Sequence, residues 1–307
     1  MACEAFRSQN FQAKTTAVIE QANTIVEEYM SQGFMLTLRQ LFYQFVARAL
    51  LDNTMQQYKR LGVIVRDARD CGLVDWDAIE DRTREVNTHV HWHDPGVRIK
   101  SAARAYREDL WAGQPYRPEV WIEKDALLGV IEGVCDEFRV PYFAHRGNNS
   151  QTLQYQAGKR FAKFLDQGLI PVVLHLADHD PKGIDMTRDN RERLALYARD
   201  NIEVHRIALN MDQVRQYAPP PNFAKEDDTL FGAYVERFGT EECWELDALS
   251  PTAIADLVRA EIEALIQWPK WNSAEAKERR SRAMLDKVAQ NWAKVEKFLR
   301  VNKGERA

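Results

Sequence analysis

From about Pro118 to Leu209 the sequence alternates between short runs of strand-forming residues and longer amphipathic stretches. The strand-like runs are 119–122, 140–144, 171–177 and 202–209, and the predicted helices between them are 125–138, 151–167 and 183–199. Strands that alternate with helices in this way form a parallel sheet with helices on both faces, because each crossover helix packs on the sheet. The sequence therefore predicts an α/β domain at residues 118–212.

Two of the predicted strands end in carboxylates. Glu123 follows the run EVWI, and Asp178 and Asp180 follow the run IPVVLHLA, just before a proline and a glycine. The carboxyl ends of parallel strands meet at one edge of the sheet, where functional crevices lie. Alternate residues of an extended backbone point to the same side. We therefore expect the three carboxylates to converge at this edge, with the ring of His179 directed away from them.

Three clustered carboxylates repel one another and need a cation. A few hard oxygen ligands that leave coordination positions open suit Mg²⁺, with Mn²⁺ as a substitute, held partly by water and by substrate phosphate. The sequence thus predicts a metal site formed by Glu123, Asp178 and Asp180. The alternative is that these acids cap the helices that follow them.

Residues 1–84 are predicted to form a separate helical module. Its helices are expected at 11–32, 37–50 and 54–71, with Thr37 as the cap of the second. The segment 73–81 that follows is long enough only for a small hairpin or wing. Three short helices and a wing indicate a winged-helix domain.

The second predicted helix carries a tyrosine outside its apolar stripe. Tyr43 lies off the stripe that includes Leu41 and Phe45, and Arg39 lies four residues earlier on the same flank. A guanidinium fixed beside a phenol favours the phenolate, or holds a phosphate next to it. The same spacing also fits an exposed tyrosine that stacks on its own arginine.

These two modules together resemble a known family. The segment WIEKDAL, with ADHDPKG 55 residues later, is similar to the Toprim domain shared by topoisomerases, bacterial primases and certain nucleases. LRQLFY is similar to the winged-helix motif of topoisomerase VI A subunits and of the meiotic double-strand-break transesterases. The order of the two domains is the family's order, and WELDALS at 244–250 resembles its C-terminal region. The resemblance in kind is closest to the compact stand-alone A-subunit-like proteins of phages and mobile elements.

The resemblance implies a Mg²⁺-dependent DNA-cleaving transesterase, an A-subunit-like enzyme of the type IIB topoisomerases. Tyr43 would attack the DNA backbone and form a 5′-phosphotyrosyl link, with Arg39 beside it and with Glu123 acting both as a metal ligand and in proton transfer. The family also implies a homodimer that makes staggered breaks in double-stranded DNA. A GHKL-type ATPase subunit would be a separate partner, since QAGKR is not a complete P-loop.

Two other functions are compatible with the same residues. In a hydrolytic Toprim nuclease, water attacks the phosphate and Tyr43 is structural. In a DNA-binding module with an inactive Toprim fold, neither Tyr43 nor the three carboxylates take part in a reaction. The intact set of three acids argues against this.

Charge is unevenly distributed along the chain. The net charge is −4 over 307 residues, but 268–307 holds 11 Lys and Arg against 5 Asp and Glu. This basic end of the predicted helical region 213–307 fits contact with a phosphate backbone, and equally a solvated helix face. The candidates for DNA contact are Lys277, Arg279 and Arg280 in the tail, and Arg146, Asn148 and Lys182 in the α/β domain.

The connector predicted at 85–117, with one short helix, holds three alternate histidines. His89, His91 and His93 would chelate Zn²⁺ if they lay on one face of a strand, but solvent-facing side chains are the expectation. Glu245 and Asp247 in WELDALS would either add a carboxylate to the metal site or begin a helix, and we favour the helix start.

Nothing in the sequence suggests a membrane partner. The first ten residues, MACEAFRSQN, do not resemble a signal peptide, and no apolar run reaches roughly 18 residues. We expect a cytoplasmic, nucleoid-associated protein. The four cysteines are too widely spaced to suggest a metal site or a disulfide framework.

Overall fold

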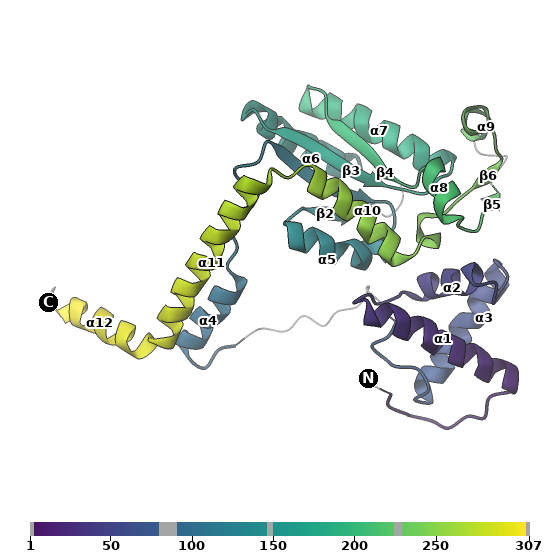
Figure 1. Ribbon diagram of the computed structural model, residues 1–307, viewed down its shortest axis with the longest axis horizontal. Coiled ribbons are helices and arrows are strands. Elements are labelled where there is room, and N and C mark those ends of the chain that lie inside the picture. Colours follow the sequence, from purple (N-terminus) through teal and green to yellow (C-terminus); the bar gives the residue numbers. More distant parts are fainter. Residues whose placement is uncertain (1–2, 80–90, 146–149, 224–228, 305–307) are drawn as a thin grey trace. The chain divides into compact units, whose positions relative to one another are not determined.

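The computed structural model describes residues 3–79, 91–145, 150–223 and 229–304, with side chains as far as residue 299. Contacts within the chain divide it into two units (Figure 1). The first unit is formed by 1–84 and 116–264, and the second by 85–115 and 265–307. The first unit carries the sheet, and the described elements of the second unit are helices.

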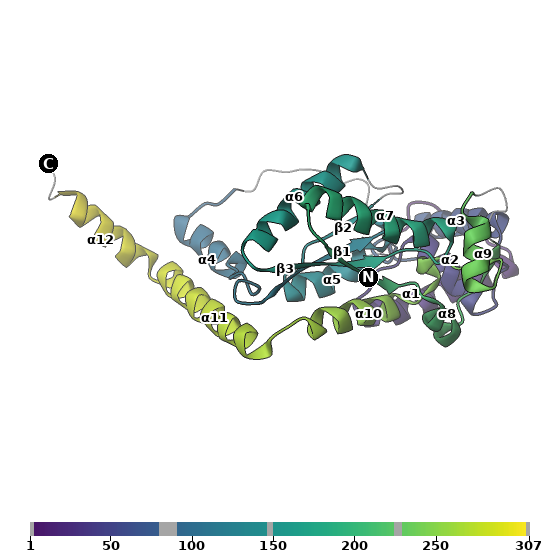
Figure 2. The same cartoon turned by 90° about the horizontal axis from the view of Figure 1, so that it is seen from above.

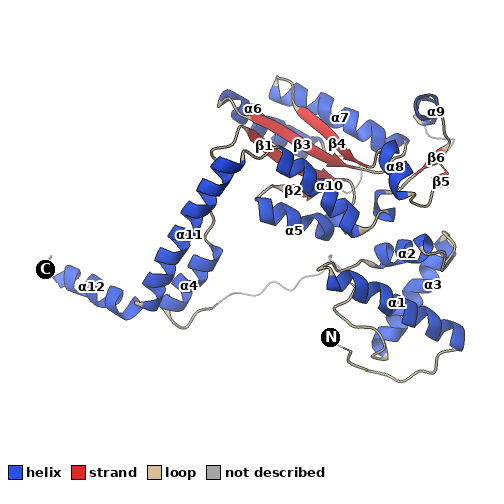
Figure 3. Ribbon diagram, in the orientation of Figure 1, coloured by secondary structure: helices blue, strands red, loops and turns tan. Residues whose placement is uncertain are grey.

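A four-stranded parallel sheet with the order β2-β1-β3-β4 forms the centre of the first unit. The strands are β1 (Tyr116–Ile122), β2 (Tyr142–Ala144), β3 (Ile170–Leu176) and β4 (Glu203–Ala208). The elements between them are η1 (Asp125–Leu127), α5 (Leu128–Phe138), α6 (Gln151–Asp166) and α7 (Pro181–Ala198). Helices α6 and α7 lie on one face, and α5 lies on the other together with the later α10 (Pro251–Ala264) (Figures 2 and 3). The predicted parallel sheet with both faces covered is confirmed.

The strand β3 explains why the sheet must be covered on both sides. Val172, Val173 and Leu174 are fully buried in succession, as in strands of parallel sheets that face helices above and below. On one face, Gly158 of α6 allows a close approach to α7, because a Cβ at this position would lie 2.5 Å from the Cβ of Tyr197.

The strand register sets the geometry of the carboxyl edge. Ile122 at the end of β1 is paired with Leu176 at the end of β3, and the backbone N–H of Glu123 donates to the carbonyl of Leu176 at 2.8 Å. The first turn of α7 lies very close to this edge. A Cβ on Gly183 would lie 2.1 Å from the carbonyl oxygen of Asp178, so only glycine allows α7 to begin there.

The N-terminal helices form a small core of their own. They are α1 (Ala13–Ser31), α2 (Leu38–Ala47) and α3 (Met55–Asp70). Ile25, Leu41 and Phe45 are among the fully buried side chains that these helices share. Thr37 and Gln40 form a capping box at the start of α2, which confirms the predicted cap. The segment expected to form a wing is described only as far as Ile79, which makes one bridge with Leu36; the rest of it lies outside the described residues.

The chain after the sheet returns to the carboxyl edge. Its elements are α8 (Met211–Tyr217), β5 (Asn222–Phe223), α9 (Phe231–Phe238), β6 (Glu242–Cys243) and η2 (Leu246–Ala248). Strands β5 and β6 pair in antiparallel fashion, and β6 leads directly into the segment Trp244–Ala248.

The second unit consists of α4 (Pro95–Ala105), α11 (Trp268–Gln290) and α12 (Trp292–Gly304). Helix α4, the one short helix predicted in the connector, packs along α11. The rings of Trp111 and Trp271 meet edge to face at 5.6 Å. His91 and His93 are exposed, and His89 lies outside the described residues. None of the described helices is both long enough and apolar enough to cross a membrane.

Candidate active site

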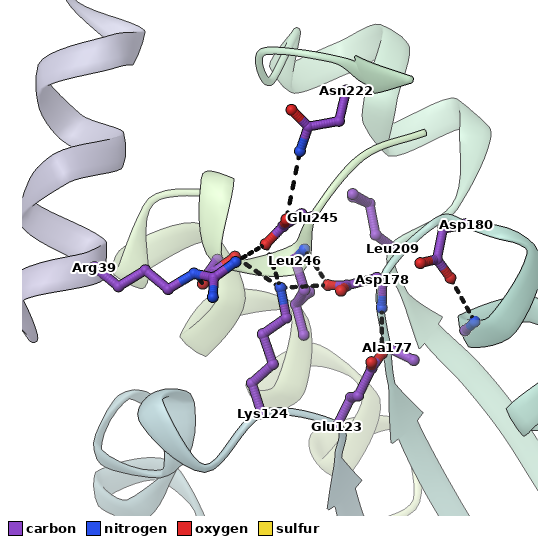
Figure 4. A network of polar contacts seen from close by, with 12 residues as sticks. Arg39, Glu123, Lys124, Ala177, Asp178, Asp180, Leu209, Asn222, Glu245 and Leu246 are labelled. Carbon is purple, nitrogen blue, oxygen red and sulfur yellow. Dashed lines mark hydrogen bonds and ion pairs between the residues drawn. The ribbon is translucent and has the colours of Figure 1, made fainter. Parts of the chain in front are cut away.

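Three predicted carboxylates lie at the carboxyl edge of the sheet (Figure 4). The Oε2 atom of Glu123 accepts a hydrogen bond from the backbone N–H of Asp178 at 2.9 Å. The Oδ1 atom of Asp178 accepts from the N–H of Leu246 at 2.7 Å. Asp180 Oδ1 accepts from the N–H of Gly183 at 2.6 Å and caps α7. The helix-capping alternative therefore describes Asp180. Glu123 instead binds the N–H of Asp178, and Asp178 binds the N–H of Leu246 at the start of η2, not one in α7.

A lysine that the sequence analysis did not single out lies among these acids. The Nζ atom of Lys124 is 2.9 Å from Asp178 Oδ1, 2.8 Å from Glu245 Oε2 and 2.9 Å from Asp247 Oδ1. Its side chain is only 16% exposed. Its three partners raise the pKa of Lys124 even though burial acts in the opposite direction, so the ammonium group stays charged.

Glu245 and Asp247 belong to this network, and they also stand at the start of η2, the position favoured from sequence. Glu245 immediately precedes η2, but its side chain makes no capping hydrogen bond. Although burial acts to raise it, Lys124 and Arg39 lower the pKa of Glu245 to about 2. Burial raises the pKa of Asp178 and of Asp247 although both contact Lys124, and the neighbouring carboxylate of Glu245 adds to the increase.

Arg39 joins helix α2 to the same acids. Its guanidinium forms an ion pair with Glu245, and its Nε lies 2.8 Å from Asp247 Oδ2. Figure 4 shows Arg39 reaching from α2 toward the group that surrounds Lys124. A continuous set of ion pairs therefore runs from Arg39 through Glu245 and Asp247 to Lys124 and Asp178.

Tyr43 is buried, contrary to the exposed position that its place off the apolar stripe predicts. It is only 5% exposed, because α2 packs against η2 on the flank opposite the helical core. Arg39 lies beside it as expected, with the guanidinium carbon 5.8 Å from the centre of the tyrosine ring. A pocket of about 230 Å³ opens next to both residues. Its other lining residues are Phe42, Asn53, Thr54, Met55, Tyr58, Asn222 and Glu245.

The expected effect of Arg39 on the pKa of Tyr43 is present but outweighed. Burial raises the pKa of Tyr43, and the charges of Asp247 and Glu245 raise it further, against the lowering effect of Arg39. The effect of Arg39, which favours the phenolate, is outweighed because burial and the two carboxylates paired with Arg39 act in the opposite direction. In this arrangement Tyr43 is a neutral phenol at neutral pH.

Charge in the site is unbalanced. Five carboxylates, those of Glu123, Asp178, Asp180, Glu245 and Asp247, interact with three cations, Lys124, Arg39 and Arg206. Arg206 is half-buried, and its Nη2 donates to the carbonyl of Asp178 at 2.6 Å. Burial and the charge of Asp178 raise the pKa of Glu123 to about 7. When all five carboxylates are ionised, they exceed the three cations by two charges, which is what one divalent cation would neutralise.

The carboxylates fit a hard cation in chemistry, although they are not gathered into a finished site. In the described part of the chain, no three His, Cys, Asp or Glu side chains are arranged as a ready metal site. One oxygen of each predicted ligand nevertheless has no hydrogen-bond partner among the described residues. These atoms are Glu123 Oε1, Asp178 Oδ2 and Asp180 Oδ2. Such oxygens are the donors that Mg²⁺ and Mn²⁺ prefer.

His179 lies between the two aspartates and is directed away from them, as predicted. Its ring is buried against Tyr234, Phe238 and Trp244, and its Nδ1 lies 2.8 Å from the hydroxyl of Tyr234. The backbones of His179 and Trp244 exchange two hydrogen bonds, at 2.8 and 2.9 Å. His179 therefore fixes the segment that carries Glu245 beside the aspartates.

Buried histidines near the sheet should make the fold sensitive to acid. Burial lowers the pKa of His145 and of His179 to about 4, and that of His175 well below its ordinary value. Because these histidines gain protons only on unfolding, they make the folded protein less stable as pH falls from about 6.5 toward 4. Glu123, with its raised pKa, has the opposite effect and makes the folded protein more stable as pH falls below 7. We expect the free energy of unfolding to be lower at pH 5 than at pH 7 by roughly 2–4 kcal/mol.

Urea unfolding at pH 5, 6 and 7 measures this difference. In Glu123→Gln the opposing group is absent, so the decrease between pH 7 and pH 5 should be larger by about 2 kcal/mol. Equal or greater stability of the unmodified protein at pH 5 would show that these histidines are not held neutral.

The residues predicted to contact DNA belong to both units. Lys182 is exposed in the first turn of α7, whereas Arg146 and Asn148 lie outside the described residues. In the second unit, Lys277 forms an ion pair with Glu108 at 2.8 Å, Arg279 lies 3.5 Å from Glu275, and Arg280 is exposed.

A scan against models of known protein families and a search of curated proteins both find no match for this chain.

Proposed function

We propose that the protein is a Mg²⁺-dependent, DNA-cleaving transesterase with a winged-helix domain and a Toprim domain, similar in kind to topoisomerase VI A subunits. The proposal rests on one observation above the others. The helix that carries Tyr43 is linked by ion pairs, through Arg39 and the Trp244–Ala248 segment, to the carboxylates at the sheet edge. A nucleophile-bearing helix and a candidate cation site thus belong to one connected group of residues.

The reaction would exchange one phosphodiester for another. The phenol oxygen of Tyr43 forms a bond to phosphorus, and the bond from phosphorus to the 3′ oxygen breaks, which leaves a 5′-phosphotyrosyl link and a free 3′ hydroxyl. When bound, Mg²⁺ would supply positive charge for the phosphate oxygens. Glu123 and the two aspartates would hold it through the oxygens that have no partner among the described residues.

Two proton transfers accompany this exchange. The tyrosine proton must pass to a base, because Tyr43 is neutral in the arrangement described. The leaving 3′ oxygen must receive a proton. Glu123 would relay that proton from its place at the sheet edge; its pKa of about 7 is that of the metal-free site, and a bound divalent ion would lower it.

The expected partners follow from this reaction. The substrate is double-stranded DNA, the active form is a homodimer that makes staggered breaks, and a GHKL-type ATPase subunit would be needed for strand passage. A cytoplasmic, nucleoid-associated location would accompany such an activity.

A second candidate is a hydrolytic Toprim nuclease. The observation that favours it is the state of Tyr43, which is buried and whose pKa is raised by its surroundings. In that case water attacks the phosphate and leaves free ends.

A mixing experiment on supercoiled plasmid tests the transesterase and its arrangement. We expect the unmodified protein to cleave in Mg²⁺ and not in EDTA, and Tyr43→Phe and Asp178→Asn each to be inactive. If one subunit delivers its tyrosine to the partner's carboxylates, the mixture of the two variants should regain nicking, because each heterodimer has one intact pair of groups. An inactive mixture, with subunit exchange demonstrated by tagged chains, would instead assign both groups to one chain.

A further inference from the structure

Lys124 occupies a position of the kind that a cation fills. Three carboxylate oxygens, from Asp178, Glu245 and Asp247, surround its Nζ atom at 2.8 to 2.9 Å. An ammonium group has three N–H donors, so all of them have a carboxylate partner. The charge of Lys124 is thus neutralised by carboxylates of the protein itself, and its side chain is held between Asp178, Glu245 and Asp247.

Asp178 lies at the junction of two such positions. Its Oδ1 atom faces Lys124 and the N–H of Leu246, and its Oδ2 atom has no hydrogen-bond partner among the described residues. Glu123, the residue directly before Lys124, accepts the backbone N–H of Asp178. Asp178 therefore holds the ammonium group with Oδ1, at what we call the inner position, and leaves Oδ2 for an outer position that Glu123 and Asp180 would complete.

We propose that Lys124 is a built-in cation that fills the inner of two adjacent cation positions, so that the site takes a single divalent ion at the outer one. This inference rests on the proposed function for the identity of the outer ligands. Lys124 acts as a positioning residue: it fixes Asp178 by one oxygen, which leaves the other oxygen for the divalent ion. Together with Arg39 it also balances Glu245 and Asp247, and without Lys124 the three carboxylates around the inner position would attract a second ion.

Counting bound Mn²⁺ tests this directly and needs no DNA. Electron paramagnetic resonance of free Mn²⁺ gives the number of ions that each chain binds. We expect one ion for the unmodified protein and two for Lys124→Met, because the vacated position keeps its three carboxylates. Lys159→Met, which removes an exposed lysine of α6, should still bind one ion.

The thermal unfolding midpoint is a second measurement, because its response to Mn²⁺ would not change if Lys124 had only a structural role. Lys124→Met should be less stable than the unmodified protein without metal, and added Mn²⁺ should raise its midpoint by a larger amount, because two ions bind the folded state. Lys124→Gln keeps hydrogen-bond donors and serves if Lys124→Met does not fold.

The outcomes separate cleanly. No ion or two ions on the unmodified protein, or a single ion on a folded Lys124 variant, would overturn the proposal. A protein that binds one ion as expected but forms no covalent adduct with DNA would overturn the transesterase function and leave the role of Lys124 intact.

Discussion

Replacing Asp178 with asparagine should lower the rate of DNA cleavage in Mg²⁺ by about a thousand-fold or more, which corresponds to about 4 kcal/mol of transition-state stabilisation. The amide has the shape of the carboxylate and can still accept the N–H of Leu246. The substitution therefore removes a charge and a metal ligand while the fold persists. A quantitative assay of supercoiled plasmid loss measures the effect.

Two companion variants distinguish charge from structure. Asp180→Asn retains the helix cap, because an asparagine oxygen can accept the N–H of Gly183 as the aspartate does. It should nevertheless lose cleavage, as should Glu123→Gln. DNA binding should be unchanged or tighter in all three, since each loses a negative charge that faces the phosphates.

Asp185→Asn is the matched control. Asp185 lies on α7, where it forms an ion pair with Arg188 at the surface, and its loss should change the rate by less than about twofold. Cleavage by Asp178→Asn at the unmodified rate would mean that this carboxylate has no part in catalysis.

The sheet and the place of the acids at its edge follow from local sequence. The run IPVVLHL can only be a strand buried on both faces, and the proline and glycine after Asp180 end it and begin α7. Parallel strands in register bring their carboxyl ends together, so Glu123 and Asp178 meet although 55 positions separate them in sequence.

The contacts of Lys124 with Glu245 and Asp247 do not follow from local sequence. Lys124 looks like an ordinary surface lysine at a strand end, and what buries it is a segment that begins 120 positions later, at Trp244. That segment is positioned by its backbone pairing with His179, a contact that no periodicity encodes. The pair of acids in WELDALS, spaced by one residue as in DHD, was the available signal.

The burial of Tyr43 could not be predicted for the same reason. Helical periodicity identifies the face of α2 that packs on α1 and α3, but η2 covers a second flank of this helix. Arg39 then meets Glu245 and Asp247, and the balance of charge around the phenol reverses relative to that expected for an isolated arginine and tyrosine pair.

Replacing Tyr43 with phenylalanine should abolish both cleavage and covalent attachment to DNA. The change removes one oxygen and little volume, so the aromatic contact with Phe42, at 5.7 Å between ring centres, should persist. Circular dichroism and the unfolding midpoint should stay close to those of the unmodified protein. No other group in the proposed mechanism replaces the lost nucleophile, so the loss should be complete rather than partial.

Tyr29→Phe is the matched control for this substitution. Tyr29 is also a buried tyrosine of the N-terminal helices, and its hydroxyl donates to Gln44 at 2.8 Å. This variant loses a buried hydroxyl and its hydrogen bond, which should lower the free energy of unfolding by about 1 kcal/mol. It should cleave DNA and form adducts normally.

The decisive measurement is the trapping of protein on DNA. A reaction with supercoiled DNA and Mg²⁺, stopped with detergent, should yield DNA that enters a gel only after protease digestion. Its 5′ ends should resist a 5′ exonuclease while its 3′ ends stay accessible, for the unmodified protein and for Tyr29→Phe but not for Tyr43→Phe. Cleavage by Tyr43→Phe at the unmodified rate, with free 5′ ends in every sample, would contradict the covalent mechanism and identify the protein as a hydrolytic nuclease.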